Sequence, residues 1–88
     1  MKMLTADEIA AGYVAEYAAA AAAGVLRRDL DPKARQAAYF AGIAAHRAAL
    51  AATAPRSPEY WAIIFGAERA ERAAFNTEHA AYIAARAA

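Results

Sequence analysis

Apolar residues recur at helical spacing along the chain, and the pattern divides into three segments. In the first segment, Ile9, Tyr13 and Tyr17 are four residues apart and share one side of a helix. The third segment has the richest apolar stripe, which is made of Trp61, Ile64, Phe65, Phe75, Tyr82 and Ile83. The opposite side of each segment is mostly alanine, and no stretch alternates apolar and polar residues as a strand would. The pattern therefore predicts amphipathic helices.

Polar residues, prolines and a glycine mark the ends of these helices. Thr5 and Glu8 have the spacing of a capping box, and Asp31 and Ser57 are each followed by proline, as N-cap residues often are. Gly24 suits the left-handed position that closes a helix. These signals predict helices over about residues 6–23, 32–53 and 58–87.

One point in the third helix is a candidate break. Asn76 and Thr77 could cap a short fourth helix, because their side chains compete for backbone hydrogen bonds. With or without this break, the sequence predicts an all-α fold, a small bundle of helices that forms a single domain over residues 1–88.

Composition leaves two packing arrangements open. More than a third of the 88 residues are alanine, so few large side chains are available for a core. The favoured arrangement has the large residues inside and alanine outside. In the other, alanine faces also pack, with close contacts at small residues such as Gly66 and Ala70, and an aromatic stripe is left free. Gly12 and Gly42 lie inside helices, which close packing against another backbone would explain.

Charge and cysteine content exclude several classes of protein. Ten basic and nine acidic residues give a net charge of +1, and there is no cysteine for disulfides or thiolate sites. A basic cluster around residues 27–35 contains Asp29 and Asp31, which argues against direct binding of nucleic acid. Uncharged runs such as residues 17–26 are too short to span a bilayer. We expect a cytoplasmic protein without a membrane partner.

The chain offers few groups for catalysis. Ser57 is the only serine, and it and Thr5 are N-cap candidates. The glycines are isolated, so no phosphate-binding loop is present, and His46 and His79 lack the further ligands of a metal site. The sequence predicts a protein that is not an enzyme, with no catalytic residues, no metal site and no cofactor.

The third helix contains the most suggestive residues. Glu68 and Arg72 are one turn apart, and both fall within the aromatic stripe. They are either a half-buried ion pair at the edge of the bundle or the charged part of a binding surface, since hot spots often combine aromatic residues with arginine. The candidate partner-binding residues are Tyr60, Trp61, Glu68, Arg72, Phe75 and His79.

These observations favour a non-enzymatic protein-interaction module that binds and occupies a surface of an unidentified partner protein or complex, or of a second copy in a homodimer. A more specific alternative is a small phage or mobile-element inhibitor, similar to anti-CRISPR proteins, that blocks a protein surface of a host nucleoprotein complex. Two further alternatives are a nucleic-acid accessory protein and a small-ligand binder. The ligand binder would have a pocket lined by Tyr13, Tyr17, Tyr39 and His46.

Overall fold

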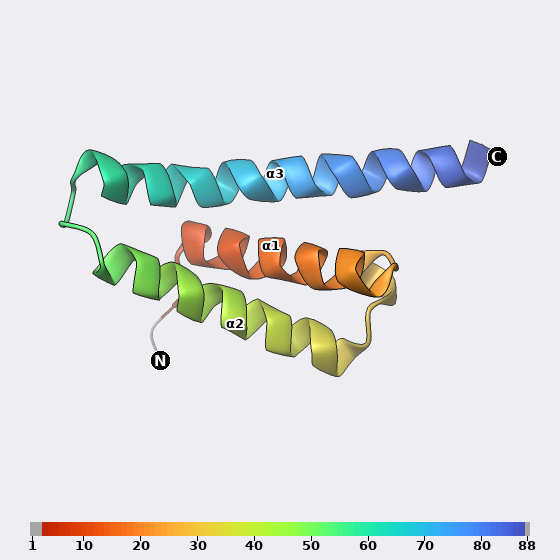
Figure 1. Ribbon diagram of the computed structural model, residues 1–88, viewed down its shortest axis with the longest axis horizontal. Coiled ribbons are helices and arrows are strands. Elements are labelled where there is room, and N and C mark those ends of the chain that lie inside the picture. Colours follow the sequence, from red (N-terminus) through yellow and green to blue (C-terminus); the bar gives the residue numbers. More distant parts are fainter. Residues whose placement is uncertain (1–2, 88) are drawn as a thin grey trace.

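In the described part of the chain, the protein forms three α-helices and one turn of 3-10 helix (Figure 1). The computed structural model describes residues 3–87. Its elements are α1 (Ala6–Ala23), the 3-10 helix η1 (Arg27–Asp29), α2 (Pro32–Ala51) and α3 (Pro58–Ala87). No strand occurs in the described part of the chain, and the all-α prediction is confirmed. α1 and α3 have the predicted bounds, whereas α2 ends at Ala51 rather than at residue 53.

The helix ends have the geometry that their sequence signals predict. The Thr5 hydroxyl accepts a hydrogen bond from the N–H of Glu8, whose carboxylate accepts one from the N–H of Thr5. The side chains of Asp31 and Ser57 each accept a hydrogen bond from the N–H three residues further on. Gly24 has a φ of 73°, the left-handed conformation in which a residue without Cβ is least strained.

α3 continues without interruption through residues 76 and 77. The Thr77 hydroxyl donates a hydrogen bond to the carbonyl of Ala73, so it bonds within the helix instead of capping a new one. The fourth helix is therefore not formed. With 30 residues, α3 is the longest element. It spans about 45 Å at ~1.5 Å per residue.

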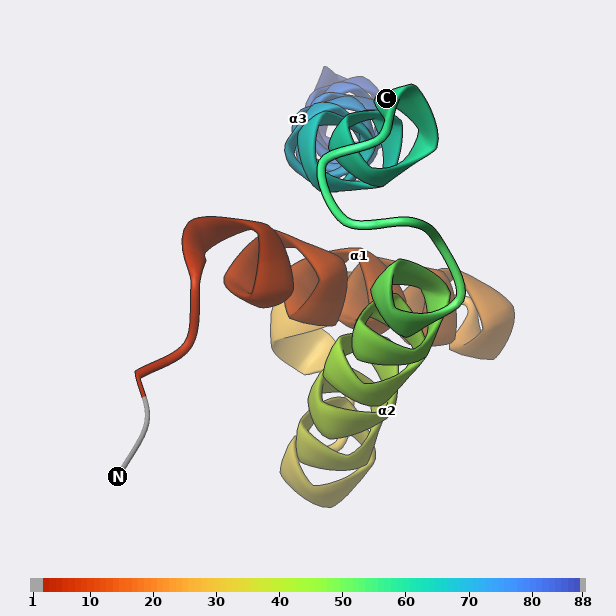
Figure 2. The same cartoon turned by 90° about the vertical axis from the view of Figure 1, so that its left-hand side faces the viewer.

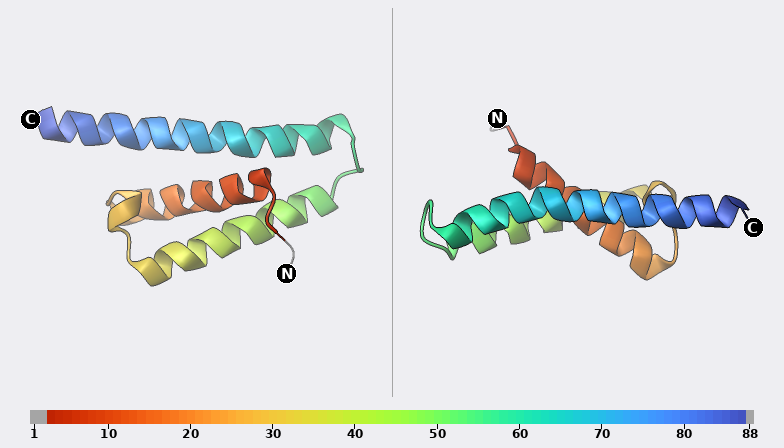
Figure 3. Two further views of the ribbon diagram at one scale, coloured as in Figure 1. Left: turned by 180° about the vertical axis from the view of Figure 1, so that it is seen from behind. Right: turned by 90° about the horizontal axis from the view of Figure 1, so that it is seen from above.

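α1 is the central helix of the fold. α2 packs on one side of it and α3 on the other, and α2 and α3 contact each other far less than either contacts α1 (Figure 2). Seen from above, α1 crosses α3 at an angle, and the C-terminal end of α3 extends past the rest of the molecule (Figure 3). The protein measures 48 × 26 × 21 Å. This open arrangement leaves much of the surface of α3 uncovered.

The helices approach each other through small residues. A Cβ added to Gly42 would lie 2.6 Å from the carbonyl oxygen of Ala11, and one added to Gly12 would lie 2.7 Å from the ring of Tyr39. The predicted close packing against another backbone is confirmed for Gly42, whereas Gly12 makes room for the Tyr39 side chain instead. The four buried positions of α1 are Ala10, Gly12, Glu16 and Ala20.

The expectation of large residues inside and alanine outside is wrong for α3 and holds in part for the other two helices. In α1 and α2 the large apolar stripes are buried or half-buried, and most alanines of the described residues are exposed. Ala20 has no exposed surface, whereas Phe40, Phe65 and Phe75 are each more than half exposed. Alanine and glycine let the helix axes come close together, and bulky rings do not fit between them. The suggested close contact at Gly66 is also wrong, because a Cβ there would meet no neighbouring helix or side chain within 4 Å.

Candidate interaction surface

One side of α3 carries a row of exposed aromatic and charged residues. We call this row the α3 aromatic face, and it consists of Trp61, Phe65, Glu68, Arg72, Phe75 and His79. The exposed fraction is 42% for Trp61, 54% for Phe65 and 53% for Phe75, and the three polar members are exposed as well. A contiguous exposed row of large apolar side chains often marks an interaction site.

A different side of α3 packs on α1. Ala67, Glu71, Ala74 and Glu78 recur every three or four residues and are half-buried there. At ~100° per residue, the α3 aromatic face lies roughly a quarter turn around the helix from this packed side. Alanine and glutamate residues of α3 thus face α1, and the aromatic residues flank this contact.

The aromatic rings of the α3 aromatic face are ordered by stacking on each other. The rings of Trp61 and Phe65 are 5.9 Å apart and inclined by 23°. The rings of Phe75 and His79 are 5.8 Å apart and inclined by 5°. Both pairs are four residues apart, the spacing that places side chains next to each other on a helix. Two stacked pairs therefore flank the charged residues at the centre.

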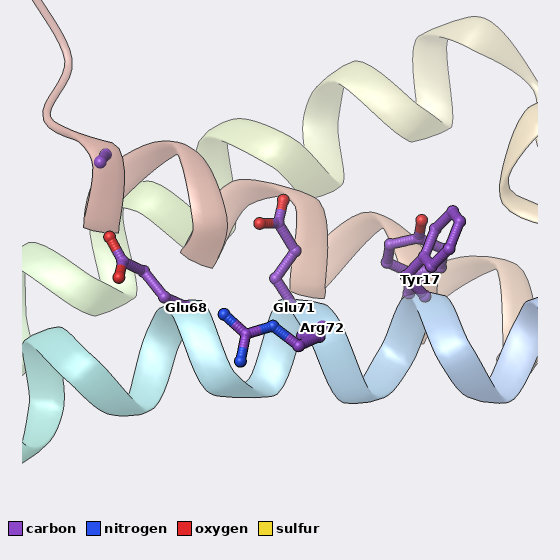
Figure 4. Close-up of a pocket in the computed structure, with 6 residues that line it drawn as sticks. Tyr17, Glu68, Glu71 and Arg72 are labelled. Carbon is purple, nitrogen blue, oxygen red and sulfur yellow. The ribbon is translucent and has the colours of Figure 1, made fainter.

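Glu68 and Arg72 form this charged centre, next to an open pocket between α1 and α3. In Figure 4 the carboxylates of Glu68 and Glu71 point toward α1, and Arg72 extends along α3 toward its N-terminal end. None of the three ion pairs found in residues 3–87 includes these side chains. The pocket is lined by Ala6, Tyr17, Glu68, Glu71, Arg72 and Phe75.

Five of the six predicted partner-binding residues lie together on this surface, and Tyr60 does not. Tyr60 is half-buried near Leu50 of α2, in a hollow at the end of the molecule where the loop between α2 and α3 lies. Phe65 belongs to the surface but was not among the predicted binding residues. Its position four residues after Trp61 was the signal that could have identified it.

Two of the four basic residues near the first loop, Arg27 and Arg28, make contacts within the molecule. The Arg27 guanidinium binds the buried carboxylate of Glu16 at 2.8 Å and lies over the rings of Tyr13 and Tyr17. Burial lowers the pKa of Arg27, but the hydrogen bonds and charge interactions with Glu16 and Tyr17 together outweigh burial, so the net shift of the pKa is upward. Arg28 lies over the ring of Tyr82. These contacts reduce the positive surface available to a phosphate backbone.

The tyrosine and histidine pocket proposed for a small ligand is not formed. His46 is buried and hydrogen-bonded to Asp7 at 2.6 Å, and Tyr39 packs edge-on against Tyr13 over Gly12. An open hollow between α1 and α2 is lined by Tyr13 and Tyr39, but neither Tyr17 nor His46 lines it. Within residues 3–87, no three His, Cys, Asp or Glu side chains gather as metal ligands would.

Comparison with known proteins does not assign a function. No protein-family model, no curated protein and no solved structure matches the chain. Among the described residues, no helix has the length and apolar character needed to cross a membrane. The chemistry of the α3 aromatic face is therefore the basis for the function proposed below.

Proposed function

We propose that this chain is a non-enzymatic protein-interaction module and that the α3 aromatic face is its binding surface. The observation that carries the proposal is the exposure of Trp61, Phe65 and Phe75 in one row, on a helix whose other side packs on α1. Because each ring is about half exposed, keeping it in water forgoes roughly 1 kcal/mol of burial for each ring. A protein partner that covers the row would recover part of this free energy.

The composition of the surface matches that of binding hot spots. Tryptophan, arginine and other aromatic residues dominate such sites because they combine a large apolar area with polar tips. The stacked pairs Trp61–Phe65 and Phe75–His79 are already ordered, so binding would cost little side-chain entropy. These features favour recognition of a protein surface.

Other functions have less support. The hydroxyls of Thr5 and Ser57 accept helix-capping hydrogen bonds, which makes them poor candidates for nucleophiles. The engagement of Arg27 and Arg28 within the molecule argues against a nucleic-acid accessory role. Blocking a protein surface of a host nucleoprotein complex is one form that the proposed function could take. The net charge of +1 favours contact with protein over mimicry of DNA in that case.

Site-specific photo-crosslinking in the host cell tests the proposal. A photoreactive phenylalanine analogue replaces Phe65, and in a matched control it replaces Phe40, which is equally exposed but lies on α2. We expect a discrete protein adduct from position 65, identified by mass spectrometry, and none from position 40. The proposal is wrong if position 65 yields no adduct, or if both positions yield the same set of proteins.

A further inference from the structure

The aromatic residues of the α3 aromatic face have the same order from either end, and the two charged residues between them exchange sign when the order is reversed. A stacked aromatic pair is followed by an acidic and a basic residue and then by a second stacked pair. The positions 61, 65, 68, 72, 75 and 79 are separated by four and three residues in alternation. This is the spacing of the core positions of a two-helix coiled coil. A second helix could therefore pack along this face for about 27 Å, at ~1.5 Å per residue.

We infer that the partner of the α3 aromatic face is a second copy of this chain, whose α3 packs antiparallel across a twofold axis near residue 70. This inference rests on the proposed function, because it names the partner of the same surface. A twofold interface must be self-complementary, since each contact occurs twice with the two chains exchanged. The residues of this face can be tested against that requirement.

The charged residues satisfy the requirement of self-complementarity. Glu68 is two residues before position 70 and Arg72 two residues after it, so each faces the other residue of the second copy. The dimer then contains two identical Glu68–Arg72 contacts between chains. Both side chains are exposed in the single chain, and neither belongs to an ion pair among residues 3–87.

The aromatic residues satisfy the requirement of self-complementarity too. Phe65 and Phe75 are each five residues from position 70, and Trp61 and His79 are each nine residues from it. Each stacked pair of one chain therefore meets the other stacked pair of the second copy. Aromatic rings that meet in this way add packing energy beyond the area they bury. The open pocket beside Arg72 and Phe75 provides room for a ring of the second copy (Figure 4).

A parallel pairing of two α3 helices fails the same test. In register, it would place Glu68 against Glu68 and Arg72 against Arg72 of the second copy. Like charges in contact at the centre of an interface disfavour association. The charge pattern thus selects the antiparallel orientation.

Sedimentation equilibrium of the full chain tests the dimer and its register together. We expect a monomer–dimer equilibrium that Glu68→Arg or Arg72→Glu each weakens about tenfold, because one substitution changes two symmetric contacts. The double variant Glu68→Arg/Arg72→Glu exchanges the charges and should restore dimerisation. Glu59→Arg is the matched control, since Glu59 is exposed on the side of α3 opposite to the α3 aromatic face and its reversal should leave the dimer unchanged.

Each opposing result has a defined meaning. If the double variant Glu68→Arg/Arg72→Glu does not dimerise again, the proposed register around residue 70 is wrong. A chain that stays monomeric at hundreds of micromolar overturns the dimer. The proposed function still holds in that case if the crosslinker at Phe65 captures another protein, and it fails as well if no adduct forms. Circular dichroism of every variant verifies that the helices are retained.

Discussion

Two acidic residues in the first turn of α1 attach this helix to α2. Glu8 binds Arg47, which lowers the pKa of Glu8 from its ordinary value of 4.5 to about 2. Burial raises the pKa of Asp7, but hydrogen bonds from His46 and Thr5 outweigh it, and the net shift is downward. Both carboxylates therefore favour the folded state when they are ionised. They also lie at a helix N-terminus, where negative charge is favourable.

These contacts predict a loss of stability in acid. A carboxylate whose pKa is lowered in the folded state stabilises the protein fully above its unfolded pKa. That contribution is lost as the pH falls through the folded pKa. We expect the melting temperature to be constant between about pH 7 and 5 and to fall between about pH 4.5 and 2. Thermal melts followed by circular dichroism at each pH in this range measure the melting temperature.

The variant Glu8→Gln assigns the effect to its residue. Glutamine keeps the capping box but removes the charge that Arg47 binds, so the melting temperature should be lower at pH 7 and fall less steeply in acid. Glu59→Gln, at an exposed carboxylate in the first turn of α3, is the control. An acid transition of Glu8→Gln identical to that of the unmodified chain would refute the assignment.

The glycines of two helices predict opposite effects of the same substitution. At Gly42 an added methyl group would collide with the backbone carbonyl of Ala11, so Gly42→Ala should destabilise the protein by about 2 kcal/mol. At Gly66 the space is open, and Gly66→Ala should stabilise α3 by about 1 kcal/mol through helix propensity. Urea unfolding at low protein concentration measures both. Equal effects of the two substitutions would contradict the close crossing of α1 and α2.

At the scale of elements, η1 connects α1 to α3. The Arg27 side chain pairs with Glu16 of α1, and its backbone N–H donates to the Glu78 carboxylate of α3 at 2.8 Å. Glu16 is only 5% exposed, so removing its partner would leave a buried charge without compensation. One residue of a short loop thus helps to place α3 beside α1.

We predict that Arg27→Met destabilises the protein by about 2 kcal/mol. This loss of stability is smaller than the loss expected on breaking a fully buried ion pair, because about a third of the Arg27 side chain is exposed. Methionine keeps much of the apolar stem but cannot neutralise Glu16. Arg28→Met is the matched control, and it should cost under about 1 kcal/mol because Arg28 makes only a surface contact with Tyr82. Urea unfolding of both variants provides the measurement, and equal losses would exclude a special role for the Arg27–Glu16 pair.

The elements of this fold were more predictable than their packing. Caps such as Thr5 and Gly24 act on backbone groups within a few residues, so a short stretch of sequence contains all the required information. The side of α3 that faces α1 depends on contacts between distant residues, such as the bond from Arg27 to Glu78 across 51 positions. The alanine side and the aromatic side of α3 have the same helical period, and periodicity alone could not distinguish them.

The sequence predicted the candidate surface only in part, because the packing of α3 depends on contacts between distant residues. The sequence indicates directly a helical stripe that contains Trp61, Glu68, Arg72, Phe75 and His79. Whether that stripe is core or surface depends on how closely α1 can approach the small residues of α3. That distance follows from the packing of all three helices.

At the scale of the whole molecule, the fold is extended for its length. The radius of gyration is 14.3 Å, compared with about 12 Å for a compact domain of this size. The excess arises because α2 and α3 lie on opposite sides of α1 and α3 is longer than the helix that supports it. A chain with so few buried large side chains has a small core, and association along α3 would enlarge the apolar area removed from water.

Association along α3 predicts that thermal stability depends on protein concentration. Burial of the α3 aromatic face in a folded dimer stabilises the folded chain by mass action. The melting temperature should then rise by roughly 3 °C for each tenfold increase in concentration above the dissociation constant. The double variant Phe65→Ala/Phe75→Ala should melt at one temperature at all concentrations. It should match the unmodified chain in dilute solution, because both rings are more than half exposed in the single chain.

The control for this experiment is Phe40→Ala, which removes an equally exposed ring from α2 and should keep the concentration dependence. Thermal melts over a hundredfold range of concentration separate two roles for the aromatic residues. If the double variant loses stability even in dilute solution, Phe65 and Phe75 support the fold of the single chain. If it loses only the concentration dependence, their contribution is made between chains, as the symmetry of the α3 aromatic face requires. A melting temperature of the unmodified chain that does not change with concentration would exclude a dimer in this range.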